Sequence, residues 1–98
     1  MTKKHHYVVV LWRSKPDRSG RVVDTHAITT KSLKYAKREA YRIAGLYYCP
    51  TDISLFKTTL RSAQNRLYRG QEPTGKLWIK WWNFQTQSHP TRWIEVSR

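Results

Sequence analysis

Apolar side chains recur at steps of three and four residues between Ser32 and Gly45, and this spacing predicts an amphipathic helix. Ser32 is a residue type that caps the start of a helix, and Gly45 followed by Leu46 has the form of a left-handed helix stop. We expect this helix to organise the packing of the chain. Its predicted core-facing side chains are Leu33, Ala36, Ala40, Ile43, Ala44 and Tyr47.

Four shorter segments have the composition or the alternation of β-strands. The first two, 7–12 and 21–30, are separated by turn-forming residues and are predicted to pair as an antiparallel hairpin. The other two are 76–84 and 92–96. In the third segment one set of alternating residues should face the core and the other the opposite side of the sheet. The core set is Leu77, Ile79 and Trp81, and the opposite set is Trp78, Lys80 and Trp82.

The segment 52–69 supports two interpretations. Five apolar positions from Ile53 to Leu67 fit a helix that Thr51 or Asp52 could cap and that Gly70 could end in a left-handed conformation. The alternative is a strand over 53–60, which is rich in strand-forming residues. We favour the helix, because the helical period accounts for the whole segment. The order is then β-β-α-α-β-β: an α+β fold with an antiparallel sheet of about four strands and both helices on one face.

Length and composition favour one domain over residues 1–98, with 1–6 as a flexible N-terminal tail. The single Cys49 allows no intramolecular disulfide, and the apolar run 7–11 is too short for a signal peptide or a membrane span. These features predict a cytoplasmic protein without a membrane partner.

Charge is the strongest indication of function. Nineteen Lys and Arg residues against six Asp and Glu give a net charge of +13, which points to nucleic acid or another acidic partner. The predicted contacts are Lys34, Lys37, Arg38 and Arg42 on the first helix, and Lys57 and Arg61 on the second. Like charges at this spacing cost an isolated helix roughly 0.2–0.5 kcal/mol each, which suggests a polyanionic partner. The alternative interpretation is a charged face that is only solvated.

The set Trp78, Lys80 and Trp82 is a second candidate, which Trp12 and Trp93 could join. Exposed indoles could stack on bases for about 1–3 kcal/mol each. Alternatively the N-terminal segment, the loop 85–91 or a second copy of the chain covers this face, the last giving a homodimer. In this interpretation the Trp face competes with the helix face, on the far side of the sheet.

Catalysis and metal binding find little support, and we expect no cofactor. His5, His6, His26, His89 and Cys49 form no spaced pair of zinc ligands. Asp24 and His26 share a strand face and could orient an imidazole, but a hydrogen-bonded pair is the simpler interpretation. A small nuclease would need these two residues for its chemistry. Because a hydrogen-bonded pair accounts for them, we expect a protein that is not an enzyme.

Two resemblances extend this picture. Lys34, Ala36, Lys37 and Ala40 match the Lys-Lys-x-Ala-Lys helix of double-stranded-RNA-binding domains, whose other elements come in a different order. Residues 30–40, 77–81 and 92–96 together resemble small phage-borne α+β proteins, some of which are anti-CRISPR inhibitors, although 51–74 adds a segment. This second resemblance implies a non-enzymatic protein that blocks the nucleic-acid path of a host complex.

The sequence therefore predicts a non-catalytic module that binds the phosphate backbone of DNA or RNA through the basic face of its first helix. The alternative is a phage-encoded inhibitor whose same charges meet a host nucleic-acid-processing protein complex in the host cytoplasm.

Overall fold

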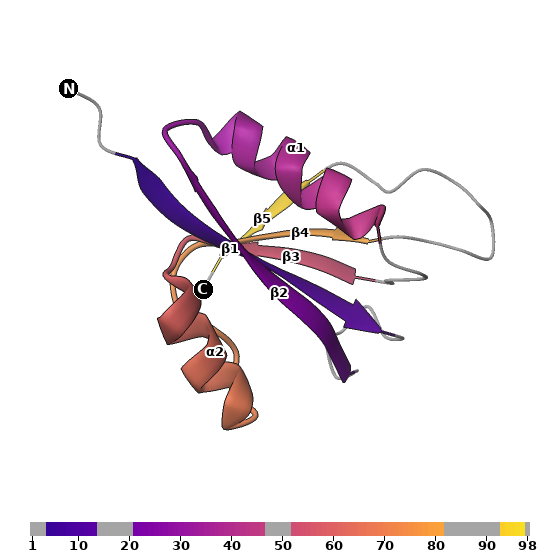
Figure 1. The fold of residues 1–98 in the computed structure, drawn as a ribbon, viewed down its shortest axis with the longest axis vertical. Coiled ribbons are helices and arrows are strands. Elements are labelled where there is room, and N and C mark those ends of the chain that lie inside the picture. Colours follow the sequence, from indigo (N-terminus) through magenta and orange to yellow (C-terminus); the bar gives the residue numbers. More distant parts are fainter. Residues whose placement is uncertain (1–3, 14–20, 47–51, 82–92, 98) are drawn as a thin grey trace.

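The structure, a computed structural model, describes residues 4–13, 21–46, 52–81 and 93–97. These residues form one antiparallel sheet of five strands and two helices (Figure 1). The elements in chain order are β1 (His5–Arg13), β2 (Arg21–Thr30), α1 (Leu33–Ala44), β3 (Asp52–Phe56), α2 (Leu60–Tyr68), β4 (Leu77–Trp81) and β5 (Ile94–Val96). The predicted α+β fold with an antiparallel sheet is confirmed, with one strand more than expected.

The additional strand is β3, because the segment 52–69 contains both a strand and a helix. The prediction of one continuous helix there is wrong. Thr59 caps α2, and its hydroxyl accepts a hydrogen bond of 3.2 Å from the backbone N–H of Ser62. The left-handed conformation predicted for Gly70 is confirmed, with φ of 75°. A short strand that is buried on both faces has no clean alternation, so its apolar spacing can imitate a helical turn.

β3 is the middle strand of the sheet, whose order is β2-β1-β3-β4-β5. The register aligns Val9, Leu55 and Trp78 across three neighbouring strands on one face. On the other face it aligns Val8, Phe56 and Leu77, and Val96 continues that row on β5. Both rows are therefore parts of a core.

The two helices lie on opposite faces of the sheet (Figure 1). Ala36, Ala40 and Ala44 of α1 pack in a cluster with Val9, Leu55 and Trp78. Ala63 of α2 packs in a second cluster with Val8, Phe56 and Leu77. The predicted placement of both helices on one face is corrected, since β1 carries apolar side chains on both of its faces and each face needs a cover.

The predicted start of α1 is confirmed, whereas its predicted C-terminal stop is wrong. The hydroxyl of Ser32 accepts a hydrogen bond of 3.2 Å from the N–H of Tyr35, which confirms the predicted cap. Gly45 has φ of −67°, so α1 ends without the predicted left-handed residue. At the start of the described chain, β1 includes His5 and His6, which were expected in a flexible tail and which pair with Thr30 and Thr29.

Neither described helix combines the length and the apolar character that a membrane-spanning helix requires.

Candidate functional site

The basic face of α1 points away from the sheet, because the buried alanines fix the rotation of the helix. Ala36, Ala40 and Ala44 have at most 1% of their surface exposed. The side chains of Lys34, Arg38 and Arg42 lie on the opposite side and are exposed, while Lys37 is half-buried at the flank. Among the described residues, no carboxylate forms an ion pair with Lys34, Lys37 or Arg38. These three cations are thus uncompensated.

Arg42 differs from its neighbours because Glu39 holds it. The guanidinium donates two hydrogen bonds to this carboxylate, from Nε to Oε2 at 3.0 Å and from Nη2 to Oε1 at 2.9 Å. This contact lowers the pKa of Glu39 below its ordinary value, and it raises the pKa of Arg42. Arg42 is therefore the predicted contact of α1 whose charge is already balanced.

Lys37 connects α1 to β4. Its ammonium nitrogen lies over the ring of Trp78, 5.8 Å from the ring centroid. Trp78 has 5% of its surface exposed and packs against Tyr7, with 6.2 Å between the ring centroids. The prediction of an exposed stacking face at Trp78 is therefore wrong, because α1 covers the face of the sheet to which this indole points.

Lys80 makes a second connection between the same elements. Its ammonium lies 4.8 Å from the ring centroid of Tyr41 on α1 and 5.8 Å from that of Trp93, just before β5. Partial burial lowers the pKa of Lys80 from its ordinary value. Tyr41 and Trp93 are half-buried, so part of each ring reaches the surface.

The two candidate sites that sequence reasoning treated as competitors thus form one surface. We call it the α1–β4 surface, and its members are Lys34, Lys37, Arg38, Tyr41, Lys80 and Trp93. Tyr41 was not predicted, although its position one helical turn after Lys37 was an available signal. Trp12 does not join this surface, since it packs in the cluster on the α2 face. Trp82 lies outside the described residues.

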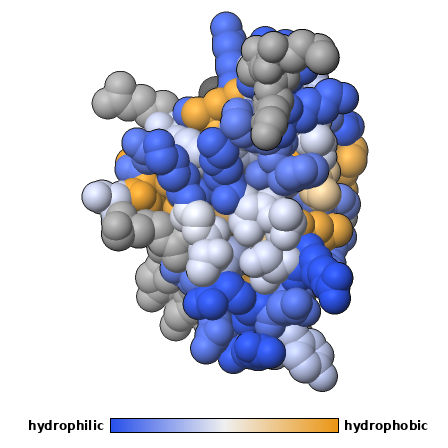
Figure 2. All heavy atoms as spheres, turned by 90° about the vertical axis from the view of Figure 1, so that its left-hand side faces the viewer, coloured by the Kyte–Doolittle hydropathy of each residue, from blue (hydrophilic) through white to orange (hydrophobic). Residues whose placement is uncertain are grey.

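The remaining predicted cations lie elsewhere. Lys57 is exposed in the connection between β3 and α2, and Arg61 is exposed in the first turn of α2. Arg61 therefore belongs to the element that covers the opposite face of the sheet from α1, and Lys57 lies in the connection that leads into this element. A view of the side that carries the N-terminal end of β1 shows hydrophilic residues over most of its area (Figure 2). Polar character alone therefore does not single out one site.

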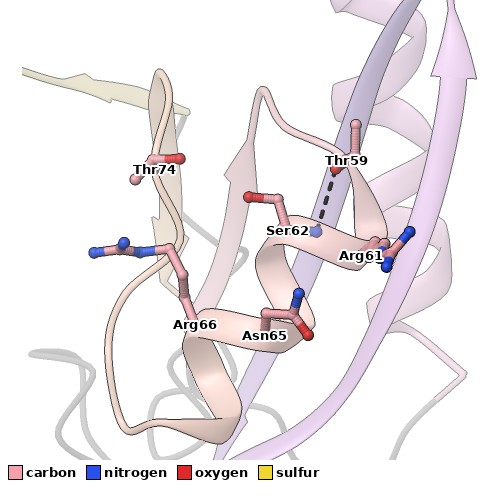
Figure 3. Close-up of a pocket in the computed structure, with 6 residues that line it drawn as sticks. All are labelled: Thr59, Arg61, Ser62, Asn65, Arg66 and Thr74. Carbon is pink, nitrogen blue, oxygen red and sulfur yellow. Dashed lines mark hydrogen bonds between the residues drawn. The ribbon is translucent and has the colours of Figure 1, made fainter.

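A shallow cavity of about 370 Å³ lies beside α2, and its lining includes Arg61 and Arg66. The close-up shows Arg66 directed toward Thr74 and Arg61 on the other side of the helix (Figure 3). The Nε of Arg66 donates a hydrogen bond of 2.6 Å to the carbonyl of Glu72, and the Thr59 hydroxyl is used by the helix cap. Arg66 thus fastens α2 to the segment that follows it, and Thr59 caps the helix.

The pair considered for acid–base chemistry is arranged as a local contact. The Nε2 of His26 lies 3.4 Å from a carboxylate oxygen of Asp24, and the other carboxylate oxygen accepts a hydrogen bond of 2.8 Å from the N–H of Thr25. Within the described residues, no three His, Cys, Asp or Glu side chains come together as a metal site. Cys49 and His89 lie outside the described residues.

Comparisons with known proteins found no family model, curated protein or solved structure that matches this chain.

Proposed function

We propose that this protein is a non-catalytic module that binds nucleic acid by holding its phosphate backbone on the α1–β4 surface. The observation that carries the proposal is the charge of Lys34, Lys37 and Arg38 on one flank of α1, which no carboxylate of the described residues balances, with Lys80 at Tyr41 of the same helix. A nucleic-acid backbone is a polyanion with closely spaced charges, and it releases counterions when such side chains neutralise its phosphates.

The helical spacing supports this assignment. Lys34 and Arg38 are separated by four residues, or about 6 Å along the helix axis, so they can meet successive charges of an extended polyanion. Repulsion between such neighbours costs about 0.2–0.5 kcal/mol per pair in the free protein. Binding a phosphate chain offsets that repulsion. A solvated surface with mixed charges has no such repulsion to offset.

The test is a salt titration of binding to labelled DNA and RNA, followed by fluorescence anisotropy. If Lys34, Lys37, Arg38 and Lys80 each neutralise one phosphate, log K against log salt should have a slope of about −3.6 on duplex DNA and about −2.8 on single strands. The double variant Lys34→Glu/Arg38→Glu should lose most of the affinity and give a shallower slope.

The chain offers a matched control. Lys57→Glu/Arg61→Glu changes the net charge by the same amount in α2 and the connection that precedes it, and it should bind nearly as the unmodified protein does. Equal losses in both variants would contradict the assignment to α1. If no nucleic acid is bound at low salt and the protein instead co-purifies with a host ribonucleoprotein complex, the inhibitor alternative replaces the proposal.

A further inference from the structure

Resting on the proposed function, we infer that the nucleic acid held by the α1–β4 surface is single-stranded, with a base stacked on the ring of Trp93 or Tyr41. Backbone contacts to a duplex need cations only, because the bases are stacked inside the helix. The α1–β4 surface combines its cations with two aromatic rings that flank one of them, and this is the composition of sequence-tolerant single-strand sites.

The position of Lys80 determines where a bound nucleotide would lie. Its ammonium lies within 5.8 Å of both ring centroids, so a phosphate bound to Lys80 brings its own nucleotide next to Tyr41 and Trp93. Lys37 and Arg38 lie about one turn before Tyr41 on α1 and can hold the neighbouring phosphates. The strand would therefore run along α1 with its bases turned toward the rings.

The rings can exchange their present contact for a base. In the free protein they are in contact with the ammonium of Lys80, and a base can stack on the part of each ring that reaches the surface. The four-carbon stem of Lys80 lets the ammonium turn from the rings to a phosphate without a change in the backbone. Tyr41 lies within α1 and Trp93 immediately precedes β5, and both rings pack against the core cluster on the α1 face of the sheet.

The experiment compares a labelled dT₂₀ strand with the dT₂₀·dA₂₀ duplex at one salt concentration. We expect tighter binding of the single strand. Trp93→Leu, which keeps an apolar side chain but removes the stacking ring, should lower single-strand affinity about 5- to 150-fold and lower duplex affinity much less. Trp93→Phe should retain part of the single-strand affinity, because a smaller ring remains.

The outcomes separate the inference from the function on which it rests. Duplex binding that equals or exceeds single-strand binding, with no effect of Trp93→Leu, overturns the inference and leaves phosphate binding in place. No binding of either ligand overturns both. Circular dichroism and thermal unfolding check that each variant is folded. If the Trp93→Leu variant is not folded, a comparison of Tyr41→Leu with Tyr41→Phe provides the same test on the other ring.

Discussion

The indole N–H of Trp12 donates a hydrogen bond of 3.0 Å to the hydroxyl of Ser54, and both side chains are buried in the sheet. Replacement of Ser54 by Ala would leave the indole donor without this acceptor. An unsatisfied buried donor costs about 1–3 kcal/mol, so we expect Ser54→Ala to lower the free energy of unfolding by that amount in urea denaturation.

A double-mutant cycle isolates this hydrogen bond. Once Trp12 is replaced by Phe, which has no N–H, the additional cost of Ser54→Ala should be much smaller. An equal cost of Ser54→Ala in both backgrounds would show that the hydroxyl stabilises the fold in some other way.

Gly70 and Gly75 provide a matched pair, because both have positive φ, at 75° and 93°, but only one is crowded. A Cβ added at Gly70 meets no atom within 4 Å, whereas a Cβ at Gly75 would clash with the carbonyl oxygen of Lys57. We expect Gly70→Ala to cost about 1 kcal/mol of unfolding free energy through the backbone conformation alone.

Gly75→Ala should cost clearly more than Gly70→Ala. The added methyl group pushes on the backbone at Lys57, where the N–H donates a hydrogen bond of 2.8 Å to the carbonyl of Lys76 and so ties the end of β3 to the start of β4. Thermal unfolding of the two variants gives the comparison, and equal melting temperatures would contradict it.

Glu39 is predicted to restrain nucleic-acid binding through its hold on Arg42. The variant Glu39→Gln removes a negative charge from α1 and weakens the two hydrogen bonds that occupy the guanidinium. We therefore expect tighter binding and a steeper salt dependence, by about one phosphate contact. Arg42→Ala should weaken binding less than Arg38→Ala does. The reverse order would show that the Glu39 contact opens at no cost when nucleic acid binds.

Lys80 should contribute to binding at the expense of stability. Burial lowers the pKa of Lys80 in the folded protein below the ordinary value of 10.5. Between this lowered pKa and 10.5, the unfolded chain therefore binds more protons than the folded chain. The penalty for burying the charge is thus complete at neutral pH and decreases as the pH rises toward 10.5. Lys80→Met keeps a long side chain that can contact the rings of Tyr41 and Trp93 through its sulfur.

We expect Lys80→Met to unfold at an equal or higher urea concentration than the unmodified protein at pH 7, and to bind nucleic acid more weakly. Urea midpoints at pH 7, 9 and 10.5 should show the difference between the two proteins narrowing. A variant that is less stable at neutral pH, by an amount independent of pH, would mean that the ring contacts outweigh the burial of the charge.

Several local features of this fold could be predicted from the sequence, and features that depend on tertiary packing could not. The helix start at Ser32, the left-handed Gly70 and the pairing of β1 with β2 are set by neighbouring residues, and they agree with the structure. The placement of the helices was missed because the five consecutive apolar residues 7–11 of β1 were interpreted as strand composition only. Such a run also indicates a strand covered on both faces.

The same omission explains the misplaced tryptophan. Once both faces of the sheet require a helix, alternation along β4 no longer distinguishes a core face from a free face, and Trp78 can be as buried as Leu77. The contact between Lys80 and Tyr41 joins residues that are far apart in the sequence, so no local pattern predicts it. Of the α1–β4 surface, the part that the sequence could predict is the row of basic residues on α1.

The strand β1 also bears on how this chain reaches its fold. Residues Val8 to Leu11 are fully buried, yet one of the two neighbours of β1 in the sheet, β3, lies more than forty residues further along the chain. The hairpin of β1 and β2 can close early, but it then presents an unpaired edge and two apolar surfaces until β3 and both helices arrive. We expect this hairpin to be the aggregation-prone intermediate of folding, and the high positive charge of the chain to be what keeps such intermediates apart.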